Sequence, residues 1–132
     1  MKYYIASSFA NKELVNQTII SLNNLGFTNT YNWTQNEKAD NKLKLKNIGI
    51  EEFNAVKDAD LLIVLLPGGK GTHIEMGIAL GCNKPIILAY FNEESITVEN
   101  SATFYHLDNV KHILVTEENI VDELVKTLKE FQ

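Results

Sequence analysis

The residues with the clearest chemical potential lie in one short stretch, Pro67–Gly77 (PGGKGTHIEMG). This stretch directly follows a continuous apolar run, Leu61–Leu66, and leads into a helical pattern of apolar residues. A buried strand, a glycine-rich turn and a helix start, in that order, bring backbone amides and the carboxylate of Glu75 to the carboxyl edge of a sheet. Open α/β sheets bind their ligands at that edge. The stretch therefore predicts a ligand site centred on Glu75.

Glu75 allows two interpretations. In the first it is structural, because Thr72 and Glu75 have the spacing of a capping box, in which the two side chains satisfy backbone amides at a helix start. In the second it is a nucleophile. The glycines then allow a ligand to approach the backbone closely, the helix-start amides favour an anionic group, and a carboxylate beside them is expected to stay ionised.

A catalytic role for Glu75 requires a second acid. Asp60 opens the buried strand at the wrong edge of the sheet for a site, so we expect it to be a solvated edge residue. The acids that the sequence offers near that strand are Glu51, Glu52, Asp58 and Asp60.

Composition and charge exclude several classes of function. The chain of 132 residues suffices for one core, and we expect residues 1–132 to form a single domain. A net charge of −5 argues against nucleic acid as a partner. The chain has no stretch as long as a membrane span, no signal-peptide pattern and only one cysteine, so we expect a cytoplasmic protein that does not contact membranes. The three histidines lack metal-ligand spacing, so neither a metal nor a cofactor is expected.

All twelve basic residues are lysine, and the chain contains no arginine. Planar, bidentate recognition of a phosphate or carboxylate is therefore unavailable within this chain. Any phosphate site must use backbone amides, hydroxyl groups and lysine.

Hydrophobic periodicity predicts strands that alternate with helices along the whole chain. Such alternation indicates βαβ units and a parallel sheet. We therefore predict an α/β fold, a single doubly wound domain of the flavodoxin or Rossmann-like type with a five-stranded parallel sheet. The predicted strands are Lys2–Ala6, Phe27–Trp33, Leu61–Leu66, Pro85–Phe91 and Lys111–Thr116, and the predicted helices are Asn11–Leu25, Leu43–Asp58, Thr72–Gly81 and Glu118–Phe131.

Several segments, in the correct order, resemble the nucleoside 2-deoxyribosyltransferase family, especially its small bacterial members. Tyr3–Phe9 (YYIASSF) is similar to the first strand and loop of the family, Tyr31–Thr34 (YNWT) to a YDWT segment, and Ala59–Asp60 to the start of the third strand. Gly71–Gly77 (GTHIEMG) matches the signature G-x-x-x-E-[LIM]-G, which holds the family's nucleophilic glutamate. Ser101–Leu107 (SATFYHL) is a further similar segment.

The resemblance implies transfer or hydrolysis of the N-glycosidic bond of 2-deoxynucleosides, or of their monophosphates, through a covalent glycosyl intermediate on Glu75. It implies that Glu52 serves the leaving base and that Tyr3 contacts the nucleophile. The small-molecule partner would be a nucleoside or nucleotide, and the absence of arginine favours the unphosphorylated form. The substrate-binding residues would be Ser7, Ser8, Phe9, Trp33, Gly68, Gly69, Lys70, Gly71, Thr72, Ser101 and Tyr105.

The resemblance also implies a homodimer or a larger homo-oligomer, because one subunit of the family completes its neighbour's site. The segment Asn92–Asn109 is long for a loop and carries two adjacent aromatic residues. Long loops with their own aromatic residues are usually functional. We therefore expect this segment at or beside the subunit interface.

Two other functions stay open at this point. The loop PGGKGTHIE also resembles the PGGxGTxxE loop of lysine-decarboxylase-like phosphoribohydrolases, although that group relies on arginine near the phosphate. Gly69 stands where the transferases have aspartate, which favours a nucleotide-sensing module that kept the pocket and lost the chemistry. Turnover of a deoxynucleoside would distinguish an enzyme from such a module.

Overall fold

Five strands form one sheet in the order β2–β1–β3–β4–β5, and the computed structural model describes all of residues 1–132. Every neighbouring pair of strands is parallel, so the predicted α/β fold with a five-stranded parallel sheet is confirmed. The strands are β1 (Lys2–Ser7), β2 (Thr28–Asn29), β3 (Leu61–Leu65), β4 (Ile86–Tyr90) and β5 (Val110–Leu114).

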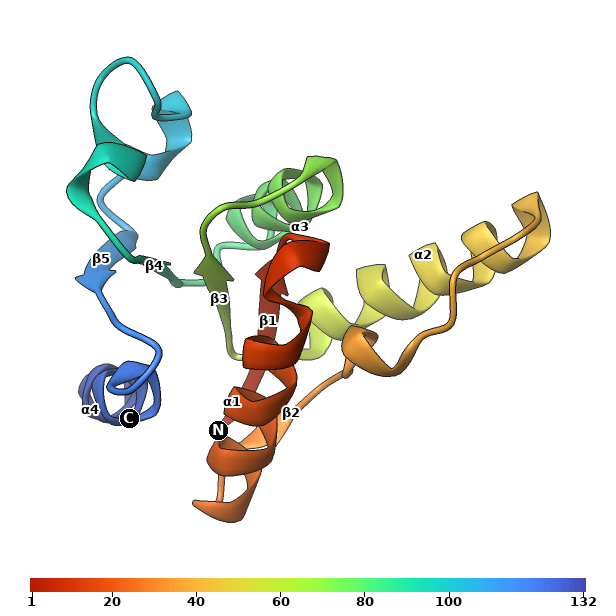
Figure 1. Cartoon of the computed structure of the whole chain (residues 1–132), viewed down its shortest axis with the longest axis horizontal. Coiled ribbons are helices and arrows are strands. Elements are labelled where there is room, and N and C mark those ends of the chain that lie inside the picture. Colours follow the sequence, from red (N-terminus) through yellow and green to blue (C-terminus); the bar gives the residue numbers. More distant parts are fainter.

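Helices cover both faces of this sheet (Figure 1). Helices α1 and α4 pack against each other on one face, and α2 and α3 pack against each other on the opposite face. Every residue of β3 and β4 is buried, which explains why these strands read as continuous apolar runs. None of the helices combines the length and the apolar character that spanning a membrane requires. The helices are α1 (Lys12–Asn24), α2 (Lys42–Asp58), α3 (Lys70–Gly81) and α4 (Ile120–Glu130).

The sheet changes its winding direction between β1 and β3. The chain leaves β1 through α1 toward β2 on one side, and it leaves β3 through α3 toward β4 on the other side. The turns after β1 and β3 therefore separate and leave a crevice between them, the usual ligand position in doubly wound sheets. The Ser8 amide, which donates to the Pro67 carbonyl at 3.1 Å, ties the bases of these turns together.

The second strand is much shorter than the predicted Phe27–Trp33. Only Thr28–Asn29 pairs with β1, because the chain then turns into a short 3-10 helix, η2 (Trp33–Gln35). The Asn32 side chain starts this helix by accepting from the Thr34 amide at 3.1 Å. The Trp33 indole donates to the Ile5 carbonyl at 2.7 Å and so holds the turn over the end of β1. The alternating aromatic residues therefore predicted a longer strand than the protein forms.

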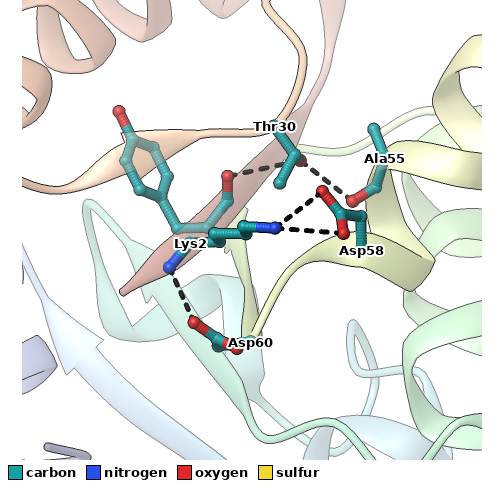
Figure 2. A network of polar contacts seen from close by, with 6 residues as sticks. Lys2, Thr30, Ala55, Asp58 and Asp60 are labelled. Carbon is teal, nitrogen blue, oxygen red and sulfur yellow. Dashed lines mark hydrogen bonds and ion pairs between the residues drawn. The ribbon is translucent and has the colours of Figure 1, made fainter.

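Acidic residues at the opposite, amino edge of the sheet serve a structural purpose (Figure 2). The Lys2 amide donates to Asp60 at 2.7 Å, and the Lys2 ammonium pairs with Asp58 at 3.2 Å. Nearby, the Thr30 hydroxyl donates to the Ala55 carbonyl at 2.9 Å, which links the end of α2 to the chain after β2. Asp58 and Asp60 are thus placed far from the carboxyl edge.

Two parts of the chain project from the sheet (Figure 1). The first half of α2 extends beyond the sheet, and nearly all its residues are exposed. The segment Asn92–Asn109 contains two short 3-10 helices, η3 (Glu93–Ile96) and η4 (Thr103–His106). Of its two adjacent aromatic residues, Tyr105 is buried and Phe104 is exposed.

Candidate active site

A tyrosine hydroxyl joins two carboxylates from different helices at the centre of the site. The Tyr4 hydroxyl, from β1, lies 2.5 Å from Oε2 of Glu75 on α3 and 3.2 Å from Oε2 of Glu52 on α2. Because both oxygens contact the same hydroxyl, they lie under ~6 Å apart. Two carboxyl groups at about 5–5.5 Å are the arrangement of retaining glycosidases.

The predicted contact between Tyr3 and the nucleophile is wrong. Successive side chains of a strand point to opposite faces of the sheet, so Tyr3 and Tyr4 cannot both face Glu75. Tyr3 faces α1, where its hydroxyl lies 3.2 Å from the Ile19 carbonyl and 3.1 Å from Oδ1 of Asn23. Tyr4 is therefore the residue that sequence analysis missed. Strand alternation allows only one of the two tyrosines to reach the site, but it does not show which one.

Glu75 has an unusual electrostatic environment. Glu75 is only 8% exposed. Burial raises the pKa of its carboxyl group from the ordinary value of 4.5 to about 8. The hydrogen bond from Tyr4 opposes this rise in pKa, whereas the nearby charge of Glu52 adds to it. Burial and the two carboxylates raise the pKa of Tyr4, so its hydroxyl stays protonated and acts as a donor.

The capping-box interpretation of Glu75 is also wrong. Helix α3 begins at Lys70 rather than Thr72, and the Thr72 hydroxyl accepts from the amide of Gly69, the N-cap residue, at 3.1 Å. Glu75 is the sixth residue of the helix and lies beyond the free amides of the first turn. Its carboxylate is thus dominated by burial, which corrects the expectation that nearby amides keep it ionised.

A pocket of about 420 Å³ opens above Glu75 at the carboxyl edge of β1 and β3. Phe9 and Trp33 form one wall, with ring centroids 5.9 Å apart. The Ser7 hydroxyl is already committed, since it donates to the Leu65 carbonyl at 2.8 Å. The pocket brings together ten of the predicted site residues, namely Ser7, Ser8, Phe9, Trp33, Glu52, Gly69, Lys70, Gly71, Thr72 and Glu75.

Three predicted substrate-binding residues lie elsewhere. Gly68 and Tyr105 line a separate cavity of about 590 Å³ on the outer side of the glycine turn. Ser101 lies in the Asn92–Asn109 segment, where its hydroxyl is 2.9 Å from Nε2 of His106. A Cβ atom on Gly68 would lie 2.6 Å from Cγ2 of Thr72, so this glycine is required for packing of the turn. Within one chain these three residues do not line the pocket over Glu75.

Comparison with known proteins gives a match to one protein family. The sequence profile described as nucleoside 2-deoxyribosyltransferase matches residues 3–110. Comparison with curated proteins gives no match.

Solved structures share the fold over nearly the whole chain. A CMP N-glycosidase of Clostridium botulinum superposes with a TM-score of 0.68 at 23% identity, covering 95% of this chain and 99% of that one. A 2-deoxyribosyltransferase from Bacillus psychrosaccharolyticus gives a TM-score of 0.64 at 19% identity, with 92% and 91% covered. A conserved protein from Enterococcus faecalis gives 0.62 at 19% identity, with 96% and 98% covered.

The contact between Tyr4 and Glu75 leads to a prediction about titration. In the wild type the carboxyl carbon of Glu75, observed by ¹³C NMR, should titrate with a pKa of about 8. Tyr4→Phe removes the hydrogen bond that stabilises the carboxylate, so this pKa should rise further. Tyr3→Phe is the matched control, since Tyr3 faces α1 and should leave the titration unchanged. An equal shift in both variants would contradict the assignment.

Proposed function

The chain belongs to the nucleoside 2-deoxyribosyltransferase family, and we propose that it cleaves the N-glycosidic bond of 2-deoxynucleosides or their 5′-monophosphates, with Glu75 as the nucleophile. The observation that carries this proposal is the pair of carboxylates on the Tyr4 hydroxyl, at the floor of a pocket built from the glycine turn. A nucleophile and a proton donor on either side of one bond are the minimum that this chemistry requires.

In the first step Oε2 of Glu75 attacks the anomeric carbon, and the bond from that carbon to the base nitrogen breaks. The base leaves with the bonding electrons and takes a proton from Glu52. The sugar is then an ester of Glu75. In the second step water or another base attacks the same carbon and releases the Glu75 carboxylate, so the configuration is retained. A missing 2-hydroxyl group makes the cationic transition state easier to reach.

Burial of Glu75 makes its ionised form less abundant but more reactive. With a pKa of about 8, only about a tenth of the free enzyme carries an ionised Glu75 at pH 7. The ionised form is poorly solvated and therefore a strong nucleophile once a substrate fills the pocket. Tyr4 keeps its hydrogen bond to the ionised form and so limits the loss of the reactive state.

The ends of the pocket suggest how the substrate lies. Phe9 is 67% exposed at the pocket wall and offers a flat face to a base. At the other wall, the helix-start residues Lys70 to Thr72 offer amides with no intrahelical partner, and Lys70 carries a positive charge. These groups suit a 5′-hydroxyl or a 5′-phosphate without any guanidinium. One structural neighbour is named for CMP, so both kinds of substrate belong in the test.

The proposed reaction predicts turnover that depends on Glu75. Deoxynucleosides and their 5′-monophosphates, incubated with and without an acceptor base, should release free base detectable by chromatography. Glu75→Gln and Glu52→Gln should lower the rate, Glu75→Gln by roughly 10³-fold or more. Glu51→Gln is the control, because Glu51 neighbours Glu52 on α2 but is exposed and outside the pocket.

The covalent step has its own readout in the same experiment. A slow, fluorinated deoxynucleoside should leave a sugar adduct on the peptide that contains Glu75. Tight binding of a nucleotide without any turnover would instead support a sensing module.

The pH dependence tests whether a carboxyl proton is needed. The proposed reaction requires Glu75 ionised and Glu52 protonated, so the carboxyl pair must keep one proton. Burial raises the pKa of Glu75 to about 8, and above that pH neither carboxyl group has a proton to donate, so kcat/KM should fall as pH rises through about 8. In Tyr4→Phe this falling limb should move to higher pH, because the hydrogen bond that lowers the pKa of Glu75 is lost. A kcat/KM that keeps rising above pH 8 would contradict the role of Glu52 as proton donor.

We further propose that the protein is a homo-oligomer. Helices α2 and α3 and the short helix η4 carry several exposed apolar side chains. The first half of α2 has almost no buried residue, and a helix without core contacts is only marginally stable alone. An apolar hollow of about 340 Å³ lies between α3 and η4, on the face that carries α2 and α3. The residues concerned are Leu43, Leu45, Ile50 and Phe53 on α2, Ile74 on α3, and Phe104 in η4.

Oligomerisation through this face can be tested with two matched substitutions. Leu45 on α2 is 60% exposed and Ile20 on α1, on the opposite face, is 52% exposed. Leu45→Glu should yield monomers in light scattering at micromolar concentration and reduce turnover, while Ile20→Glu should leave the wild-type mass. A fully active wild-type monomer would contradict the proposal.

A further inference from the structure

His73 connects the wall of the Glu75 pocket to the Asn92–Asn109 segment. Its Nδ1 lies 2.8 Å from the Gly69 carbonyl oxygen, and its Nε2 lies 2.6 Å from the Tyr105 hydroxyl. The His73 and Tyr105 rings are also stacked, with centroids 5.8 Å apart and planes inclined by 25°. Neither residue lines the pocket above Glu75, whereas Gly69 does.

The two contacts determine the tautomer of His73. A carbonyl oxygen can only accept, so Nδ1 must carry a proton and donate to Gly69. In the neutral imidazole Nε2 is then an acceptor, and the Tyr105 hydroxyl donates to it. Burial raises the pKa of Tyr105, so this hydroxyl keeps its proton. These two hydrogen bonds form a relay, in which the Tyr105 hydroxyl donates to His73 and His73 donates to the Gly69 carbonyl.

The Gly69 carbonyl shares a peptide plane with the amide of Lys70. Since the C=O and N–H of one peptide unit point in opposite directions, holding the Gly69 oxygen sets where the Lys70 amide points. That amide is the first of the helix and has no intrahelical partner. On the other side of Gly69, its own amide donates to the Thr72 hydroxyl. The relay thus fixes the orientation of the Gly69–Lys70 peptide unit, and the Thr72 hydroxyl holds the peptide unit before it.

Tyr105 is well suited to be a fixed point. It is only 4% exposed, and its amide donates to the Ala102 carbonyl at 3.0 Å. Its carbonyl oxygen lies 2.6 Å from Nε2 of His112 on β5, which ties it to the sheet. His73, by contrast, is an exposed residue of a first helical turn and would have many side-chain conformations without this partner.

We propose that Tyr105 and His73 are positioning residues that hold the Gly69–Lys70 peptide in the orientation required for substrate binding in the Glu75 pocket. The kinetic part rests on the proposed function, whereas the orientation of the peptide does not. Helix α3 does not depend on the relay, because the Gly69 oxygen also accepts the helical bond from the His73 amide. That bond is long, at 3.3 Å, whereas the bond from the His73 imidazole is shorter, at 2.8 Å. Loss of the relay should therefore affect substrate binding more than stability.

A set of substitutions separates the two bonds of the relay. Tyr105→Phe removes only the hydroxyl, and His73→Gln places its amide near Nε2 and loses the donor to Gly69. Each should raise KM roughly tenfold, about the contribution of one hydrogen bond, with kcat much less affected. Adding Tyr105→Phe to His73→Gln should cost nothing further. His73→Asn, whose amide can replace Nδ1 but has no atom near the Tyr105 hydroxyl, should raise KM about as much as Tyr105→Phe does.

Denaturant unfolding of each variant provides the control for stability, and Tyr90→Phe is the matched aromatic control, since the Tyr90 ring contacts His112 edge-on and not His73. A fall in kcat/KM that tracks the loss of stability across all variants would reduce the relay to packing and overturn the proposal. Full additivity of Tyr105→Phe and His73→Gln would overturn it as well.

NMR of the substrate-free protein tests the relay independently of turnover. Imidazole ¹⁵N spectra should show the Nδ1–H tautomer of His73, and the Lys70 amide resonance should move in Tyr105→Phe and His73→Gln but not in Tyr90→Phe. If the wild type turns over no deoxynucleoside or monophosphate, the proposed function fails, and these spectra alone decide the relay. An Nε2–H tautomer, or a Lys70 amide that stays in place in Tyr105→Phe, would overturn it.

Discussion

The hydrogen bond from Tyr4 to Glu75 is the interaction on which the site depends. An acid on a helix that packs against a parallel sheet is pushed toward its neutral form, because burial removes water from the carboxylate. Without this donor the pKa of Glu75 would be higher still, and its ionised form would be rarer. The Tyr4 hydroxyl supplies that donor from a fully buried residue of the sheet, and it also contacts Glu52. A single strand residue therefore positions both acids and tunes the one that is buried.

The remaining structure can be understood from the need to hold this trio at an accessible edge. Strands β1 and β3 must be adjacent for Tyr4 to meet Glu75, and the 2-1-3-4-5 order provides this along with a crevice above them. Helix α2 must cross close to α3 for Glu52 to join them, and these helices pack on the same face. The aromatic pair Phe9 and Trp33 then closes one wall of the crevice, with the Trp33 indole fixed to the main chain of β1.

The sequence was sufficient to predict the fold class, the strand–turn–helix that carries Glu75, and ten residues that the pocket gathers. The fold class and the strand–turn–helix were predictable because local periodicity and glycine placement are sequence-local signals. The pocket residues came mainly from the family resemblance, and their roles in binding and catalysis stay predictions. The errors concern which face of the sheet a side chain occupies and how far a strand extends. Tyr3 and Tyr4 differ only in which side of β1 they occupy, and that side is set by which helices cover each face. Likewise, the aromatic alternation of Phe27–Trp33 was overridden by a side-chain cap at Asn32 and by the Trp33 bond to Ile5.

The lack of arginine explains why the glycine turn matters so much in this chain. A guanidinium group can adjust to a ligand and still bind it with two bonds, but a backbone amide binds only where its peptide plane points. Lys70 adds charge on a flexible stem and contributes little direction. Recognition at this wall therefore depends on the orientation of a few peptide units, and Thr72 and His73 hold the two that flank Gly69. Since glycine residues lack side chains to restrain them, contacts of this kind are what convert a flexible turn into a fixed binding surface.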